Sequence, residues 1–97
     1  MENLVIKIEN VDGENVVSSR VIAEEMQKEH KDVLEKIRNI TAESSATKYF
    51  KLNSYESRGK SYPEYLMNKD GFVLLMMNYT GYNDFKIKYI EKFNEME

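Results

Sequence analysis

One side of a helix over residues 31–39 would carry five polar side chains, those of Lys31, Asp32, Glu35, Arg38 and Asn39. Arginine can donate two parallel hydrogen bonds to guanine, and asparagine can form an equivalent pair with adenine. Lys31 stands at the start of the segment, where a helix N-terminus approaches phosphate. These residue types at this spacing indicate a surface that reads DNA.

Such a surface needs a helix that is buried on its other side. Four apolar residues of the same segment fall within one helical arc: Val33, Leu34, Ile37 and Ile40. A shorter helix is predicted before it, because the serines at 18 and 19 can cap a helix start and residues 27–29 leave room for a turn. Its apolar side consists of Ile22, Ala23 and Met26. The stretch from Ser18 to Ile40 therefore predicts a helix-turn-helix whose second helix recognises DNA.

The charges on the second helix can instead satisfy one another. Asp32 and Lys36 are four residues apart and Glu35 and Arg38 three, and surface pairs of this kind contribute only about 0.3–0.5 kcal/mol each. The one histidine, His30, lies at the edge of the apolar arc. A structural hydrogen bond at the turn is expected for it in preference to a phosphate contact, and no spacing supplies a partner for catalysis.

A short β-hairpin is predicted before the helices. Residues Leu4 to Ile8 alternate as a strand, Asp12-Gly13 is a strong signal for a tight turn, and Val16-Val17 would form the returning strand. Val17 would then pack on Ile22 if Ser18 caps the first helix. We expect this hairpin to brace the first helix.

A second hairpin is predicted after a loop at residues 41–47. Alternation over residues 48–56 and 61–67 predicts its strands, and Gly59 suits the positive φ of the turn between them. Pro63 has no N–H for a ladder, so the return strand should lie at a sheet edge there.

Arg58 and Lys60 lie at the tip of this second hairpin, which makes it a candidate wing that reaches phosphate or the minor groove. A solvated turn is an equal alternative. Arg20 and Lys28, at the two ends of the first helix, are further candidates for the phosphate backbone, or are simply solvated.

Two helices are predicted in the last third. Asn68 can cap the first, Asp70 suits the positive end of its dipole, and Thr80-Gly81 would stop it. Its apolar side would be Phe72, Leu75, Met76 and Tyr79. The second helix starts near Asn83 and has a wide apolar side that includes Phe85, Ile87, Tyr89, Ile90, Phe93 and Met96. The sequence ends while this helix is still periodic, so we expect a fragment or a helix that pairs with another chain.

Composition restricts the function further. The 97 residues suffice for one domain, and 41% apolar and 32% interspersed charged residues predict a globular fold. There is no cysteine and one histidine, which argues against disulfides, thiolate zinc and most enzyme chemistry. The net charge is −3, but residues 18–60 carry nine Lys and Arg against seven Asp and Glu. No segment resembles a signal peptide or a bilayer span, and a cytoplasmic location is expected.

Several blocks of the chain resemble the Rha family of phage regulatory proteins. They are SSRVIAEE, then His30 with VLEKIRNI, then YPEYLM, KDGFVLLMMNYTG and YIEKFNEME, and together they cover nearly the whole chain in the right order. The resemblance implies a regulator of temperate phages or prophages, with an N-terminal DNA-binding-like domain often followed by a separate C-terminal region. One departure is Gln27, where helix-turn-helix proteins commonly have glycine, and this allows a longer or shifted turn.

We therefore predict an α+β fold in a single domain over residues 1–97, a winged helix-turn-helix with a short N-terminal hairpin and two C-terminal helices. The predicted function is DNA-binding transcriptional regulation in a bacterial host, without enzyme activity, cofactor or metal. Double-stranded DNA is the expected partner, with homodimerisation as a usual means of gaining affinity, and no membrane or small-molecule substrate is expected. The alternative is an antirepressor-like module that binds a phage or host regulator. The predicted DNA-binding residues are Arg20, Lys28, Lys31, Glu35, Arg38, Asn39, Arg58 and Lys60.

Overall fold

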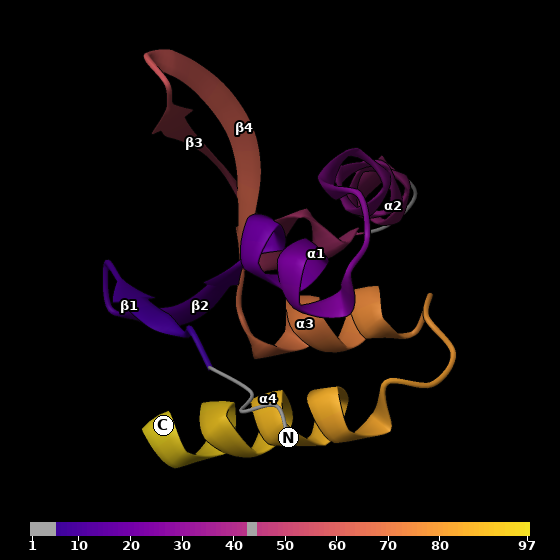
Figure 1. Ribbon diagram of the computed structural model, residues 1–97. Coiled ribbons are helices and arrows are strands. Elements are labelled where there is room, and N and C mark those ends of the chain that lie inside the picture. The colour runs from indigo at the N-terminus through magenta and orange to yellow at the C-terminus, as the bar shows by residue number, and fades with distance from the viewer. Residues whose placement is uncertain (1–5, 43–44) are drawn as a thin grey trace.

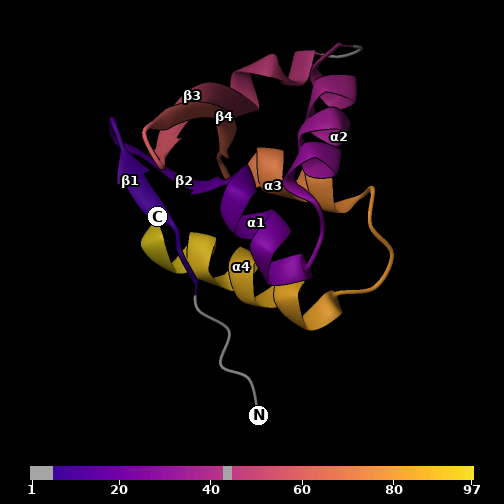
Figure 2. The ribbon, with the colours of Figure 1, turned by 45° about the horizontal axis from the view of Figure 1, so that its top comes forward.

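A computed structural model describes residues 6–42 and 45–97, which form an α+β fold with a curled antiparallel sheet of order β1-β2-β4-β3 (Figures 1 and 2). The strands are β1 (Glu9–Val11), β2 (Glu14–Ser18), β3 (Phe50–Ser57) and β4 (Lys60–Met67). The helices are α1 (Ser19–Met26), α2 (His30–Ala42), α3 (Lys69–Met76) and α4 (Asn83–Met96), with a 3-10 helix η1 (Ser45–Tyr49). The predicted α+β class is confirmed.

The α1–α2 pair forms where the apolar pattern places it. The Ser18 side chain caps α1 by accepting a hydrogen bond from the Arg20 N–H at 3.0 Å. Gln27 itself adopts the left-handed conformation at φ 57°, and the Lys28 N–H donates to the Ala23 carbonyl at 2.8 Å. The turn therefore keeps the predicted three residues between Met26 and His30 without a glycine, and neither helix is shifted.

The N-terminal hairpin has the predicted turn but a different first strand. Residues 4 and 5 lie outside the described part of the chain, and residues 6–8 are not part of a strand. The tight turn at Asp12 and Gly13 fixes the register, so that Glu9 lies opposite Val16. Residues 6 and 8 are isoleucines that pack on the core instead, which the strand prediction did not foresee.

The second hairpin forms as predicted except that Lys48 and Tyr49 belong to η1 and not to the first strand, and β3 and β4 pair along their whole length. At Pro63, β4 has β3 as its one neighbouring strand in the described sheet, because β2 pairs with β4 only at Leu66 and Met67. The loop predicted over residues 41–47 is wrong in part. Its first two residues extend α2, and from Ser45 the chain forms η1, which buries Ala46 against the core.

The C-terminal helices supply the centre of the core. Asn68 caps α3 as predicted by accepting a hydrogen bond from the Gly71 N–H at 3.0 Å. Phe72 of α3 is fully buried and lies within 5.3–6.0 Å, between ring centroids, of three aromatic rings of α4: Phe85, Tyr89 and Phe93. The α3 helix ends before the predicted Thr80-Gly81 stop, although Tyr79 is still buried.

A glycine brings α3 into direct contact with the base of the second hairpin. A Cβ atom at Gly71 would lie 2.7 Å from the Tyr49 carbonyl oxygen, which is closer than real Cβ atoms approach, and 3.0 Å from the Met67 Cβ, which is unusually tight. Glycine at this position therefore seats α3 against η1 and β4.

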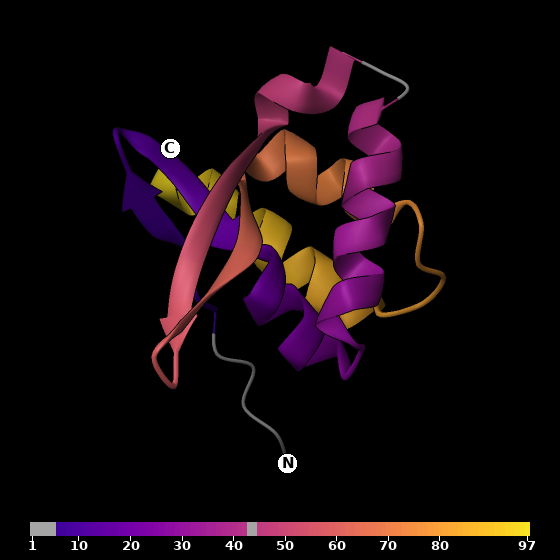
Figure 3. The same cartoon turned by 90° about the horizontal axis from the view of Figure 1, so that it is seen from above.

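The helices and the second hairpin are arranged in layers around α1. In Figures 1 and 3, α2 and the β3–β4 hairpin lie on the side of α1 away from α4, with the hairpin to one side of α2 and the α3–α4 loop to the other. This places α2 and the hairpin tip on a common side of the molecule.

Candidate nucleic-acid interface

The outward face of α2 carries the five polar residues that the sequence pattern predicts there. Val33 and Ile37 on the opposite face are fully buried and fix the rotation of the helix. The outward residues are all exposed: Lys31, Asp32, Glu35, Arg38 and Asn39. The face is thus presented to solvent as one strip, available to a partner.

The charges of this face do not pair with one another. Neither Asp32 with Lys36 nor Glu35 with Arg38 forms an ion pair, and the ion pairs within residues 6–42 and 45–97 all lie elsewhere. The Lys36 ammonium instead lies 5.7 Å from the centre of the Tyr79 ring. The alternative in which the charges of α2 pair with one another is therefore not observed among the described residues.

The tip of the β3–β4 hairpin has a backbone that its arginine does not favour. Arg58 and Gly59 have φ values of 54° and 77°, the pair of positive angles of a type I′ turn. Asparagine and glycine are the usual residues at such positions, because a side chain in the left-handed region is strained. Arg58 and Lys60 are both exposed at this tip.

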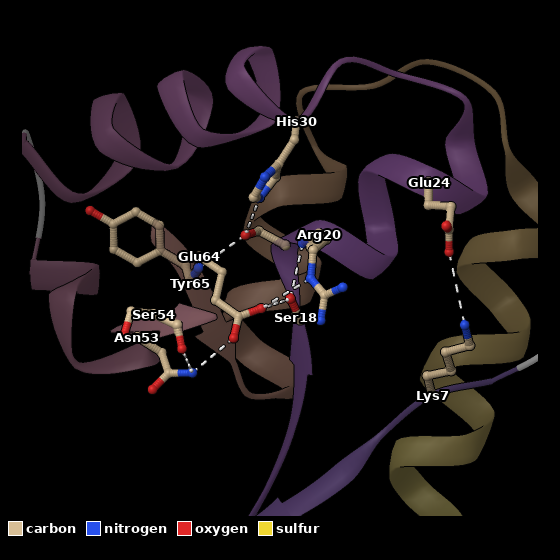
Figure 4. Close-up of polar contacts among 10 residues, drawn as sticks. Lys7, Ser18, Arg20, Glu24, His30, Asn53, Ser54, Glu64 and Tyr65 are labelled. Atoms are coloured by element: carbon tan, nitrogen blue, oxygen red, sulfur yellow. Dashed lines mark hydrogen bonds and ion pairs between the residues drawn. The ribbon is translucent and has the colours of Figure 1, made fainter. Parts of the chain in front are cut away.

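A buried carboxylate fastens the hairpin to the start of α1 (Figure 4). Glu64 of β4 is only 5% exposed. The Ser18 hydroxyl donates to its Oε1 at 2.5 Å, the Asn53 amide donates to its Oε2 at 2.8 Å, and the Arg20 Nε lies 3.7 Å from Oε1. Because a buried carboxylate without partners is strongly unfavourable, these three contacts hold α1, β3 and β4 in one arrangement.

A second polar contact joins both helices to β4. The Tyr65 N–H donates to the Ser19 hydroxyl at 2.9 Å, and the same hydroxyl lies 2.9 Å from His30 Nε2. Burial lowers the pKa of His30, and Arg20 lowers it further while Glu64 opposes the shift. The ring is neutral at pH 7, so the Ser19 hydroxyl can donate to Nε2 while it accepts from Tyr65. His30 therefore has a structural hydrogen bond, as expected, but its partner is Ser19 at the start of α1 and not the turn between the helices.

Aromatic rings extend this junction toward the hairpin tip. The Arg20 guanidinium carbon lies 4.3 Å from the centre of the Tyr55 ring. The same ring is 6.3 Å from His30 and 5.6 Å from Tyr62, between centroids. Arg20 is therefore engaged within the chain by Tyr55 and Glu64, although about half of its side chain is exposed.

The structure divides the eight predicted DNA-binding residues into separate places. Four lie on the outward face of α2, namely Lys31, Glu35, Arg38 and Asn39, and two at the hairpin tip, namely Arg58 and Lys60. Arg20 lies at the junction of α1 with the hairpin. Lys28 lies in the helix turn, with its ammonium 5.9 Å from the Tyr79 and Tyr82 ring centres.

The sequence reasoning missed the residues that position the hairpin. Ser19, Asn53 and Glu64 have no local pattern that marks them, since their partners are distant in the chain. One signal was present for Glu64, because alternation along β4 puts it on the same side as Tyr62 and the buried Leu66. An acidic residue at such a position needs a polar partner.

The fold and this surface define an α+β domain that presents a polar helix and a basic-tipped hairpin on a common side. No helix in residues 6–42 or 45–97 is both long and apolar enough to cross a bilayer.

The chain belongs to the family of phage regulatory protein Rha, whose family model matches residues 17–97. It is also 32% identical over 88 residues to an uncharacterized protein of Haemophilus influenzae, a match that covers 84% of this chain. The chain spans 51% of the length of that relative. No solved structure matches it. This is the family that the sequence blocks resembled.

Proposed function

We propose that this chain is a winged helix-turn-helix DNA-binding domain of a phage or prophage transcriptional regulator, active in the cytoplasm of the bacterial host. The observation that carries the proposal is the outward face of α2, exposed and free of ion pairs with other described residues. With α2 in the major groove, Lys31, Arg38 and Asn39 would contact base edges and Glu35 would accept from cytosine.

The β3–β4 hairpin acts as the wing in this proposal. It lies on the same side of α1 as α2, and Arg58 and Lys60 are exposed at its tip (Figure 1). The positive φ of Arg58 supports the assignment, because an arginine in the left-handed region costs free energy that asparagine or glycine would largely avoid. Arg20 and Lys28 would add phosphate contacts through their exposed parts.

The overall charge of −3 does not oppose this arrangement. Charges separated by more than about 10 Å are largely screened at ordinary salt concentrations, so the local cations of α2 and the wing determine the contact with phosphate. The described residues share one hydrophobic core, which supports a single domain.

A titration of labelled mixed-sequence duplex at several salt concentrations tests the proposal. We expect affinity to fall steeply as salt rises, because each neutralised phosphate releases counterions. Arg38→Glu should abolish binding. The matched control is Lys88→Glu, which makes the same charge reversal at an exposed position of α4 and should retain binding. Equal binding by Arg38→Glu and the wild type would exclude α2 as the recognition helix.

A protein-binding function is the second candidate, and exposed apolar side chains on the C-terminal helices favour it. Met77, at the end of α3, is 77% exposed and Ile87 of α4 is 52% exposed, and a shallow groove between the two helices is lined by Val73, Lys86 and Ile90. Such a surface suits an antirepressor-like module or a homodimer. The molar mass from light scattering over a range of concentrations tests the homodimer. A strict monomer that also binds no duplex would leave another regulator as the partner.

A further inference from the structure

The flank of α2 opposite the hairpin carries a second group of cations. The Lys28 ammonium lies 5.9 Å from the ring centres of Tyr79 and Tyr82, and the Lys36 ammonium lies 5.7 Å from the centre of the Tyr79 ring. These two tyrosines belong to the loop that joins α3 to α4, residues 77–82. Two ammonium groups eight residues apart in the chain therefore meet at the Tyr79 ring, and that of Lys28 also lies beside Tyr82.

The loop is built to hold these rings in place. Tyr79 is 9% exposed, and its carbonyl accepts a hydrogen bond from the Lys86 ammonium. Gly81 and Tyr82 have φ values of 86° and 57°, and the Tyr82 ring packs edge-on against Tyr79 at 6.4 Å between centroids. A bulky residue in the left-handed region is strained. This strained backbone places the Tyr82 ring beside the Lys28 ammonium.

The two lysines are electrostatically available. Neither forms an ion pair with a carboxylate among residues 6–42 and 45–97. Asp32 is the nearby acid of α2, and its charge helps to raise the pKa of Tyr79, after burial, without pairing with either lysine. An ammonium attracted to a ring face still has N–H groups that point away from the ring and can donate to an anion.

The position of the two lysines suits a long anionic partner. On the helical wheel of α2, Lys36 lies on the Asp32 side, whereas Arg38 lies on the Leu34 side. Figure 3 shows the α3–α4 loop and the hairpin on opposite sides of α2. A nucleic-acid duplex on the outward face would therefore pass cations on both flanks, at the wing and at Lys28 and Lys36.

We propose that Lys28 and Lys36, held by Tyr79 and Tyr82, form a second binding site for the phosphate groups of a nucleic-acid backbone, on the flank of α2 away from the hairpin. This site rests on the proposed DNA-binding function and extends it, because it assigns a role to Lys36 and to the α3–α4 loop. It contributes to affinity for any sequence and carries no base preference.

The salt dependence of duplex binding tests the site. We expect the double variant Lys28→Gln with Lys36→Gln to lose affinity about equally for mixed-sequence duplexes, and to reduce the slope of log affinity against log salt by about two, since each phosphate contact contributes about 0.9. Lys28→Arg with Lys36→Arg keeps both charges and should keep the slope. The matched control is Lys88→Gln with Lys92→Gln, which removes two charges from α4 and should leave the slope unchanged.

The possible results separate this site from the proposed function. Wild-type binding with a slope that falls only in the Lys28 and Lys36 glutamine variant supports the site. Wild-type binding with an unchanged slope in that variant overturns the site and leaves α2 and the wing as proposed. An equal fall in the α4 control also overturns it, because the effect would then come from net charge. No duplex binding by the wild type at low salt overturns the DNA-binding function and this site together.

Discussion

Arg20 and Arg38 are both partly exposed arginines near the start and end of the helix pair, yet the structure uses them differently. The guanidinium of Arg20 lies over the Tyr55 ring and beside the buried Glu64 carboxylate. Arg38 is exposed on α2 and has no ion pair with any described residue. One arginine holds the hairpin against α1, and the other makes no ion pair with the rest of the described chain.

This difference predicts that the residues that stabilise the fold are separate from those proposed to bind DNA. At the junction of α1 with the hairpin, polar groups are buried and matched with one another, so each depends on its partners. On the outward face of α2, polar groups are solvated and few contacts hold them. Substitutions at the junction should therefore change folding most, and those on α2 should change binding most.

The largest effect is expected from Glu64→Ala at the junction. It removes the acceptor of Ser18, Asn53 and Arg20 and should lower the free energy of unfolding by about 2–4 kcal/mol. Urea unfolding followed by circular dichroism measures it. Glu64→Gln keeps the volume and some of the hydrogen bonds, and should lose less. A loss below about 1 kcal/mol for Glu64→Ala would show that the junction is not a stabilising element.

The pair Arg20→Met and Arg38→Met tests the comparison directly. Arg20→Met should lower the free energy of unfolding by about 1 kcal/mol, because it removes the cation from Tyr55 and leaves Glu64 with one partner fewer. Arg38→Met should stay within about 0.5 kcal/mol of the wild type but weaken duplex binding about tenfold or more. Chemical unfolding and duplex titration of both variants give the four values. If both variants lost stability and duplex affinity to the same extent, Arg20 and Arg38 would not differ in their roles.

Arg58→Asn tests two effects of one residue at the hairpin tip, namely the strain of its backbone and its proposed contact with DNA. Asparagine accepts positive φ more readily than arginine, so the free energy of unfolding should rise by about 0.5–1 kcal/mol. Duplex affinity should fall, with a salt slope smaller by about one. Thermal unfolding and the salt titration measure the two changes. A stabilised variant with unchanged duplex affinity would show that the hairpin tip is a solvated turn that does not contact DNA.

The smallest effect is the pH dependence that His30 contributes at the junction. Its pKa in the folded chain lies below the ordinary value of 6.5, so the unfolded chain binds the proton more readily. The contribution is fully present above pH 6.5 and is lost as the pH falls through the folded pKa. The stability difference between the wild type and His30→Asn should therefore be larger near pH 8 than near pH 5 in urea unfolding. A difference that does not change with pH would mean that the ring is not buried as a neutral group.

The sequence predicted α2 and the β3–β4 hairpin because their signals are local. Apolar residues three and four positions apart define the buried face of α2, and a glycine beside Arg58 marks the turn. The junction could not be predicted in the same way, because Ser18 and Glu64 are 46 residues apart and meet only through the pairing of β2 with β4. The roles of the exposed cations in DNA binding remain predictions.

The second hairpin projects beyond the Glu64 junction, so a change of angle at this junction displaces the hairpin tip. Beyond Glu64, the two strands continue without another neighbouring strand in the described sheet to the tip at Lys60, a reach of about 13 Å at about 3.3 Å per residue. A tilt of about 10° at this junction would move the tip by about 2 Å, which is more than half of the rise of about 3.4 Å between successive base pairs of B-DNA. A small change of angle at the buried Glu64 junction is thus amplified into a larger displacement of the exposed hairpin tip.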